Sequence, residues 1–275
     1  MEKIIAISTT AYDGYSIEVA LEQISALGCK YVEPAAITGI IEHIKPENFN
    51  DNYVLYLKNM LHKYGLKSIS FSGHVNLTDE DIVPIFKKRM DFAKKIGAKI
   101  INTNAGPWEK SAIFYQNISA IAEYAEELGL IVALETHGDI INSGKESKKV
   151  IEKIKSNNIK INYDFANVLY YSDGKIRPEE DFKYILEYIA HLHIKDISLS
   201  ENIWSFTQIG KGIINYEYIF GVLRENNREI LMSLEFPLRL SGRKGYPLQK
   251  SITIPQIEKI NQIVRDSMQY VEKLT

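Results

Sequence analysis

The sequence predicts an α/β fold, a (β/α)8 TIM barrel in a single domain over residues 1–275, from two features. Short apolar runs rich in β-branched residues alternate with amphipathic stretches along the whole chain, which is typical of parallel strands joined by right-handed helical crossovers. An open doubly wound sheet shows the same alternation. However, no Gly-x-Gly-x-x-Gly motif follows the first strand, and evenly spaced strand–helix units favour a closed barrel.

The expected elements follow one another in a regular order. Strands are expected at residues 4–8, 31–34, 67–72, 99–104, 130–135, 159–164, 189–194 and 230–235. Helices are expected at residues 16–27, 52–64, 79–96, 111–128, 147–156, 178–188, 216–225 and 255–274. The first four helices run into Gly28, Gly65, Gly97 and Gly129, because glycine readily ends a helix. Thr78 is expected to cap the third helix, since three acidic residues follow it.

Composition and charge exclude several classes of protein. The formal net charge is −2, with acidic and basic residues mixed along the chain, so no nucleic-acid or membrane partner is expected. No apolar run approaches the length that crosses a bilayer. Cys29 is the only cysteine, and Met1-Glu2-Lys3 does not begin a cationic and then apolar leader, so the sequence favours a cytoplasmic protein.

The fifth to eighth expected strands each end in a side chain that can bind a metal. These side chains are Glu135, Asp164, His193 and Glu235. In a TIM barrel the active site lies at the carboxyl ends of the strands. Because side chains alternate along a strand, all four lie on the inward face, above small or polar residues. Singly, each has a structural explanation such as a helix cap or a salt bridge. Together they predict one shared site.

Three carboxylates and one imidazole make a ligand set for one divalent metal ion, and Mn²⁺, Mg²⁺, Co²⁺ and Zn²⁺ all suit it. A cation also explains how Glu135, Asp164 and Glu235 can share a small space without strong repulsion. His191 faces inward too, but it lies two residues deeper in the strand than His193. We therefore expect His193 to be the ligand and His191 to belong to a hydrogen-bonded layer beneath the metal.

The segments around these ligands are similar to those of a known family. They are residues 134–137, 164–167, 193–196 and 233–235, with a Gly-x-Gly loop at 208–216 and a strand end at 72–77. On these motifs, the chain resembles the xylose isomerase-like TIM barrel superfamily, the sugar phosphate isomerase/epimerase group, over essentially its whole length. The resemblance implies one divalent metal held by Glu, Asp, His and Glu from strands five to eight. It also implies a small carbohydrate substrate and a homo-oligomer, since members are often dimers or tetramers.

One position departs from the family pattern. Many members carry a histidine three residues after the strand-six aspartate, where this chain has Asn167. Asparagine is a poor metal ligand, which argues against a site with several zinc ions. The related AP endonuclease branch needs further histidines after strand seven, and none of the six histidines lies beyond His193. Cleavage of a nucleic-acid backbone is therefore not expected.

The resemblance implies an enzyme of sugar metabolism, an isomerase or epimerase acting on a ketose, a sugar phosphate or a similar polyol ketone. Glu135 and Glu235 are the expected catalytic residues, one removing the proton next to the carbonyl and the other returning a proton, with the metal stabilising the enediolate. If a β-hydroxyl is expelled instead, the same site is a dehydratase of the inosose or dehydroshikimate kind. A non-catalytic sugar-binding barrel is the third alternative.

Further residues are expected around the substrate. His74, His137 and Asn167 leave their strands toward the same end of the barrel and could bind hydroxyl groups, and Lys195 lies where a strand becomes a loop. Arg239 and Arg243 follow the eighth strand and could meet a phosphate or carboxylate. Asp196 has two expected roles, since it could orient His193 from behind the metal or cap a turn.

Overall fold

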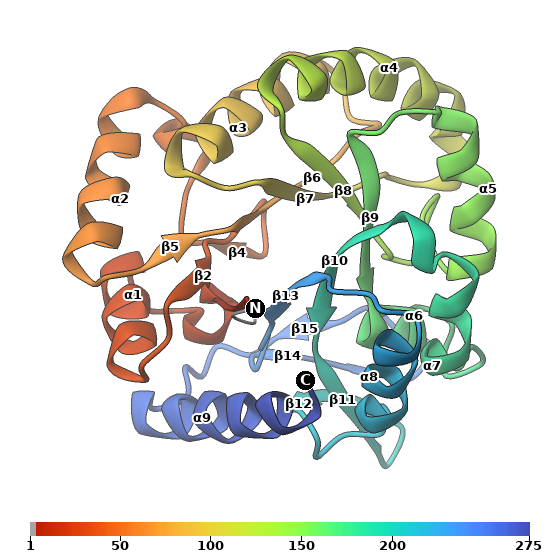
Figure 1. Ribbon diagram of the computed structural model, residues 1–275. Helices are drawn as coiled ribbons and strands as arrows, with labels where there is room; N and C mark the ends of the chain where they lie inside the picture. Colours follow the sequence, from red (N-terminus) through yellow and green to blue (C-terminus); the bar gives the residue numbers. More distant parts are fainter. Residues whose placement is uncertain (1–3) are drawn as a thin grey trace.

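The computed structural model describes residues 4–275, whose parallel strands form a barrel surrounded by helices (Figure 1). The hydrogen-bonded order of the strands is β5-β2-β1-β13-β10-β9-β8-β7-β6. The two ends of this order, β5 (Lys67–Ser68) and β6 (Ser70–Asn76), are parts of one interrupted strand. The amide of Ser72 donates to the carbonyl of Pro34 at 3.0 Å, which connects β6 to the end of β2 (Tyr31–Glu33). The predicted barrel is confirmed.

The remaining barrel strands lie within a residue or so of their predicted places. They are β1 (Ile5–Ser8), β7 (Ile100–Asn104), β8 (Ile131–Glu135), β9 (Ile159–Asp164), β10 (Ile189–Ile194) and β13 (Leu231–Leu234). In the parallel register, Asp164 pairs with His193, and His193 pairs with Ser233. The carboxyl ends of these neighbouring strands therefore meet at one end of the barrel.

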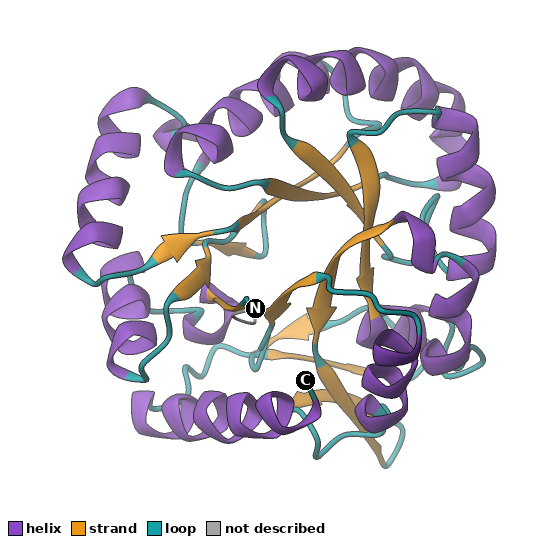
Figure 2. Ribbon diagram, viewed as in Figure 1, coloured by secondary structure: helices purple, strands orange, loops and turns teal. Residues whose placement is uncertain are grey.

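Helices cover the outside of the barrel (Figure 2). The longer ones are α1 (Ile17–Ala26), α2 (Asp51–Lys63), α3 (Ile82–Ile96), α4 (Ser111–Leu128), α5 (Gly144–Ile154), α8 (Tyr216–Glu225) and α9 (Ile257–Leu274). Short 3-10 helices occur at η1 (Thr9–Tyr12), η2 (Pro46–Asn48), η3 (Trp108–Lys110), η4 (Phe182–Tyr184) and η5 (Leu186–Tyr188). Side-chain caps start several helices: the hydroxyl of Ser16 accepts a hydrogen bond from the amide of Val19, and that of Ser143 from Glu146.

Two helix predictions were wrong. The third helix begins at Ile82, because Asp81 takes a left-handed conformation (φ 52°) at its N-cap position. Thr78 is therefore not the cap, and its buried hydroxyl has no hydrogen-bond partner within residues 4–275. The predicted helix at 178–188 is only one turn, α7 (Pro178–Asp181), followed by η4 and η5. A short helix that the sequence analysis missed, α6 (Phe165–Tyr171), follows β9 directly.

Small antiparallel sheets in the loops after the barrel strands were not predicted. One is the hairpin of β3 (Ala36–Ile37) and β4 (Ile41–Glu42). The other has four strands, β11 (Asp196–Ser200), β12 (Ile203–Thr207), β14 (Leu240–Arg243) and β15 (Gln249–Lys250). They follow β2, β10 and β13, so both sheets stand beside the carboxyl ends of the barrel strands.

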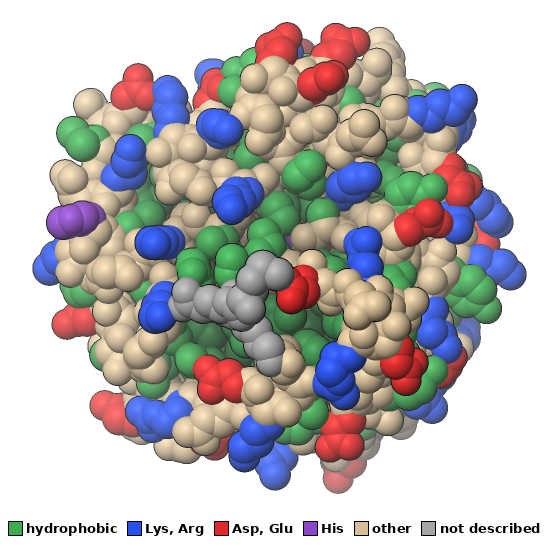
Figure 3. Space-filling model, viewed as in Figure 1, with side chains coloured by type: hydrophobic (Ala, Val, Ile, Leu, Met, Phe, Trp, Pro, Cys, Tyr) green, Lys and Arg blue, Asp and Glu red, His purple; other side chains and the backbone are tan. Residues whose placement is uncertain are grey.

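The surface carries charges of both signs. Figure 3 shows one face of the molecule, on which Lys and Arg side chains are interspersed with Asp and Glu rather than gathered in one area. Within the described part of the chain, no helix is long and apolar enough to cross a membrane. The expectation drawn from Met1, Glu2 and Lys3 lies outside the described residues.

Candidate active site

A cavity of about 400 Å³ lies at the carboxyl ends of the barrel strands. The side chains that line it include six of the predicted site residues: His74, Glu135, His137, Asn167, Lys195 and Glu235. Asp164 and His193 are fully buried just beneath them. The cavity thus joins residues that come from strands β6, β8, β9, β10 and β13 or directly follow them.

The four predicted metal ligands converge on one point. The Nδ1 atom of His193 lies 2.9 Å from Oε2 of Glu135. The same atom is 3.7 Å from Oδ2 of Asp164 and 3.7 Å from Oε2 of Glu235. All four side chains are at most 5% exposed. Three carboxylates therefore surround one ring nitrogen at the bottom of the cavity, as the strand ends predicted.

Lys195 supplies a positive charge to this cluster. Its Nζ lies 2.6 Å from Oδ2 of Asp164 and 2.7 Å from Oε2 of Glu235. Burial lowers the pKa of Lys195, but the two carboxylates outweigh this effect and hold the pKa above its usual range. Burial raises the pKa of Asp164, and although Lys195 opposes the shift, the value reaches about 6. Asp164 thus depends on nearby cations to stay ionised.

Glu135 has hydrogen-bond partners on both of its carboxylate oxygens. Its Oε2 lies 2.8 Å from Nε2 of His74 and accepts a hydrogen bond of 2.8 Å from the amide of Asn162. Its Oε1 accepts one of 2.7 Å from Asn167. Burial raises the pKa of Glu135, but the charges of His74 and His193 outweigh burial and hold the pKa well below its usual range. Glu135 is therefore an ionised carboxylate that faces the cavity.

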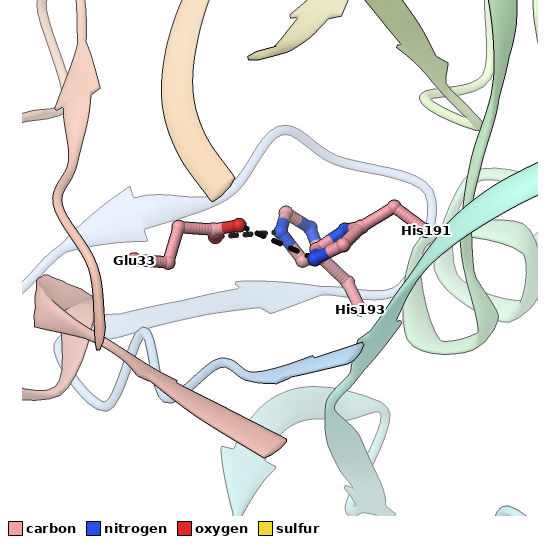
Figure 4. A group of neighbouring side chains, drawn as sticks. All are labelled: Glu33, His191 and His193. Carbon is pink, nitrogen blue, oxygen red and sulfur yellow. Dashed lines mark hydrogen bonds and ion pairs between the residues drawn. The ribbon is translucent and has the colours of Figure 1, made fainter. Parts of the chain in front are cut away.

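A fifth acidic residue, Glu33, was not among the predicted site residues. It ends β2 and reaches across the barrel toward His191 and His193 of β10 (Figure 4). Its Oε1 accepts a hydrogen bond of 2.8 Å from Nε2 of His193, and its Oε2 accepts bonds of 3.0 Å from Ser233 and Asn102. Burial raises the pKa of Glu33, but the charge of His193 more than offsets it and the pKa falls to about 2.

This contact determines how His193 faces the cluster. Because the Glu33 carboxylate can only accept, Nε2 of His193 carries a hydrogen, and Nδ1 is the atom directed at the other carboxylates. Burial lowers the pKa of His193, but Glu33, Glu235 and Glu135 together hold it well above its usual range. These carboxylates therefore favour a positive charge on the ring, which offsets part of the surrounding negative charge.

His191 lies beneath the cluster, as expected. Its Nδ1 is 2.9 Å from the side-chain oxygen of Asn162, and its Nε2 is 3.0 Å from the hydroxyl of Ser233. Burial lowers the pKa of His191 to about 4, so the ring is neutral near pH 7. We call the buried set Glu33, Asn102, Asn162, His191 and His193 the floor network.

Two other predicted residues lie elsewhere. The carboxylate of Asp196 accepts hydrogen bonds of 2.9 Å from the amides of Ile197, Gly210 and Gly212, so it fastens a loop, the second of its two expected roles. Arg239 does not line the cavity, because its guanidinium binds Asp13 at 3.2 Å and the carbonyl of Ser251 at 2.7 Å.

His137 and Arg243 complete the predicted set. His137 lines the cavity, and its Nε2 lies 2.9 Å from the hydroxyl of Tyr171. Burial lowers the pKa of His137 to about 4, so it is a neutral hydrogen-bonding group. Arg243 is exposed and its guanidinium lies 5.8 Å from the ring centre of Tyr246, outside the cavity lining.

A family model described as a xylose isomerase-like TIM barrel matches residues 21–272. The chain belongs to this family. A curated relative, an inosose dehydratase of Clostridium botulinum, is 24% identical over 209 residues, which span 70% of this chain and 64% of the relative. Two solved structures share the fold at 16% identity. One is a D-psicose 3-epimerase with D-fructose present (TM-score 0.74, covering 98% of this chain and 99% of that one). The other is a xylose isomerase-like protein from Mycobacterium smegmatis with magnesium (TM-score 0.71, covering 98% and 100%).

In this xylose isomerase-like barrel, two groups of side chains have atoms close enough together to share a metal ion. Glu33, His191 and His193 form one group, and Glu135, Asp164 and His193 form the other. The first is sealed, because its side chains are fully buried and bonded to one another. The second is open to the cavity, and within the described residues Oδ2 of Asp164 has an ion-pair partner, Nζ of Lys195 at 2.6 Å, but no hydrogen bond of regular geometry. With Glu235, the second group fits a divalent cation that prefers oxygen ligands.

Glu33 could have been found from the sequence. It ends its strand as Glu135 and Asp164 end theirs, within the run Tyr31-Val32-Glu33-Pro34. The predicted metal ligands come from the last four strands, whereas this residue comes from the second strand. A search for ionisable groups at every strand end would have included it.

Proposed function

We propose that the chain is a divalent-metal-dependent isomerase or epimerase that acts on a ketose or a related polyol ketone. One observation carries this proposal. Glu135 and Glu235 line the same cavity, come from β8 and from the end of β13, and flank the point where His193 Nδ1 and Asp164 also meet. Two carboxylates placed around one substrate-sized space can exchange a proton with the two sides of a carbon atom.

Glu135, Asp164, Glu235 and Nδ1 of His193 would hold the metal. When bound, the ion would act as a Lewis acid that polarises a carbonyl group. Glu33 would position the ring of His193 through Nε2, as carboxylates behind metal-binding histidines do. Lys195 is paired with Asp164 and Glu235, and its positive charge would offset part of the negative charge of these carboxylates while the substrate is bound.

The two glutamates would move the proton. One would remove it from the carbon next to the carbonyl, giving an enediolate, and the other would return a proton to the opposite face or the neighbouring carbon. The ionised state of Glu135 suits it to accept a proton. Asn167 donates to Glu135 and lines the cavity, so it would keep this carboxylate in place while the substrate is bound.

Polar groups on the cavity wall would bind the substrate's hydroxyls. His74 and His137 both line the cavity, and neutral His137 can donate or accept. Lys195 and Asn167 offer further donors at the same depth. Arg239 is left out of this set, since its guanidinium is committed to Asp13 and Ser251.

A dehydratase is the second candidate, and the relative named inosose dehydratase favours it. Both reactions begin with removal of a proton next to a carbonyl. They differ in whether that proton is replaced or a β-hydroxyl leaves. The product therefore decides between them, while the start of the reaction does not.

Solvent exchange tests the proposal. The protein would be loaded with Mn²⁺ to form the holoenzyme, and excess Mn²⁺ would be removed. The holoenzyme would then be incubated in D₂O with ketoses and inososes. Finally, the substrates would be isolated and analysed by NMR. We expect deuterium at the carbon next to the carbonyl, with an epimer or isomer as product. An unsaturated product would favour the dehydratase, and no exchange with any compound would favour a sugar-binding barrel. Exchange that persists in the Glu135→Gln, Glu235→Gln double variant would contradict the roles of these residues.

A further inference from the structure

We propose that the substrate of this cavity is an uncharged polyhydroxy ketone that carries an apolar substituent, and not a sugar phosphate. This inference rests on the proposed function, because it concerns the same cavity. It depends on two features of the cavity: the side chains that surround its opening, and the pairing of the cations near it.

The cavity has polar and apolar parts. Ionisable groups such as Glu135 and Glu235 lie at its base, next to the buried Asp164 and His193. The rest of the wall is largely apolar and comes from the β3–β4 hairpin, α6 and the four-stranded sheet. We call its main side chains the rim: Ile37, Ile40, Tyr170, Phe206, Leu240 and Leu248. A ligand that fills the cavity therefore presents hydroxyls to the base and apolar surface to the rim.

The rim keeps apolar surface open to the solvent. Ile40 is 42% exposed at the tip of the hairpin. Leu240 and Leu248 are half-buried, and they belong to the segments that follow β13. A bare ketose has few apolar atoms to cover these side chains, whereas a substituent on its far end would cover them. The burial of apolar surface by such a substituent would make the free energy of binding more favourable.

The cations near the cavity are already paired. Lys195 lies within 2.7 Å of Asp164 and Glu235. Lys250 also lines the cavity, and its Nζ is 2.9 Å from a carboxylate oxygen of Asp13. No arginine is among the described lining residues, and Arg239 turns to the same Asp13. A phosphate dianion at the rim would thus meet no unpaired side-chain cation among the described lining residues, which is unlike sites built for phosphate.

The volume agrees with this substrate. The cavity measures about 400 Å³. Pockets of about 300–1,000 Å³ hold drug-sized ligands. A ketone with several hydroxyls and one apolar group would span the base and the rim together.

Three ketoses that differ only at O6 test the proposal: D-fructose, D-fructose 6-phosphate and 6-O-benzyl-D-fructose. Their dissociation constants for the Mn²⁺-loaded protein would be measured by ligand-observed NMR. We expect the benzyl ether to bind about tenfold more tightly than fructose, the effect of burying one small apolar group. The phosphate should bind more weakly than fructose. A phosphate that binds as tightly as fructose, a benzyl ether that gains nothing, or no binding by any of the three would overturn the proposal.

A pair of variants tests the rim itself. The Ile40→Asn, Leu248→Asn double variant should bind the benzyl ether no more tightly than fructose. Its affinity for fructose should be unchanged, and this binding would also show that the variant folds. The matched control is Leu55→Asn on α2, an apolar residue that is 61% exposed and does not line the cavity. This control should still bind the benzyl ether more tightly than fructose. If the double variant does so too, the rim is not the binding surface.

These outcomes separate the substrate class from the reaction. Deuterium exchange with any polyol ketone, combined with tighter binding of the phosphate, would reject the substrate class and leave the proposed function standing. Tighter binding of the benzyl ether without exchange by any ketone would do the reverse.

Discussion

The floor network lies beneath the base of the cavity and the rim surrounds its opening, and the two are built in different ways. The floor network comes from barrel strands, is buried, and consists of polar side chains that bond to one another, such as Glu33 to His193. The rim comes largely from loop segments outside the barrel, and its side chains are apolar and partly open to solvent.

This difference indicates that one set of residues supports the reaction and another set selects the substrate. The register of parallel strands fixes the floor network, so a change there disturbs charges that have no access to water. The rim lies outside the strand register, and we expect most of its side chains to be exchangeable with little effect on the base of the cavity. TIM barrels commonly support different reactions by changing the loops around a constant barrel. We expect the floor to determine metal binding and proton transfer, and the rim to determine which ketone enters.

Removal of the metal has the largest expected effect and should act on the base of the cavity alone. After dialysis of the holoenzyme against EDTA, deuterium exchange should fall to the background rate, because the site would then lack the Lewis acid that polarises the carbonyl group. Addition of Mn²⁺ should restore it. The advantage of the benzyl ether over fructose should remain, since the rim does not contact the ligand set. Exchange at an undiminished rate in EDTA would contradict this account.

The next largest effect is expected for Glu33→Gln. A neutral amide accepts a hydrogen bond from Nε2 of His193 more weakly than a carboxylate and can instead present its NH₂ group, so Mn²⁺ affinity measured by chelator competition should fall about 10–100-fold. Circular dichroism would check that the fold is kept. Glu47→Gln, at an exposed position in η2, is the matched control and should leave the affinity unchanged. Unchanged affinity in Glu33→Gln would show that the floor network does not position the ligand.

Asp196→Ala should affect stability and leave the metal site intact. Its carboxylate accepts amide hydrogen bonds from the loop at Gly210 and Gly212, and the substitution removes the acceptor that holds this loop in place. We expect the free energy of unfolding to fall by about 1–3 kcal/mol, with a lower Tm in differential scanning calorimetry. Mn²⁺ affinity should not change. A large loss of affinity with normal stability would instead give Asp196 the role of orienting His193.

Arg239→Ala has the smallest expected effect on function. The guanidinium binds Asp13 and Ser251 outside the cavity lining, so the exchange rate with a neutral ketose should stay within about twofold of the original. The rate would be measured with a saturating ketose. A selective loss of activity toward a phosphorylated sugar would show that this arginine reaches the substrate after all.

Strand ends were predictable from the sequence because two simple rules govern them. Side chains alternate along a strand, and active sites of TIM barrels lie at the carboxyl ends. These rules placed Glu135, Asp164, His193 and Glu235 together, and the structure brings them within 3.7 Å of one ring nitrogen. The order of His191 below His193 followed from position in the strand alone.

Contacts across the barrel and within the loops were harder to predict. Glu33 meets His193 from a strand 160 positions earlier in the chain, and no local pattern connects the two residues. The two strands of the β3–β4 hairpin have two residues each, and so does β15 of the four-stranded sheet. Such short runs lack a clear periodicity. The third helix starts late because of the conformation of Asp81, which composition does not reveal.

The metal content of the protein tests the central claim most directly. Mn²⁺ would be added to the metal-free chain, excess removed, and bound metal determined by mass spectrometry for the original protein and for the Asp164→Asn, His193→Asn double variant. The asparagine at 164 keeps an acceptor for the cap of α6. The exposed pair Asp79→Asn, His62→Asn is the control. We predict one ion per chain in the original protein and the control, and none in the double variant. One ion retained by the double variant would contradict the site.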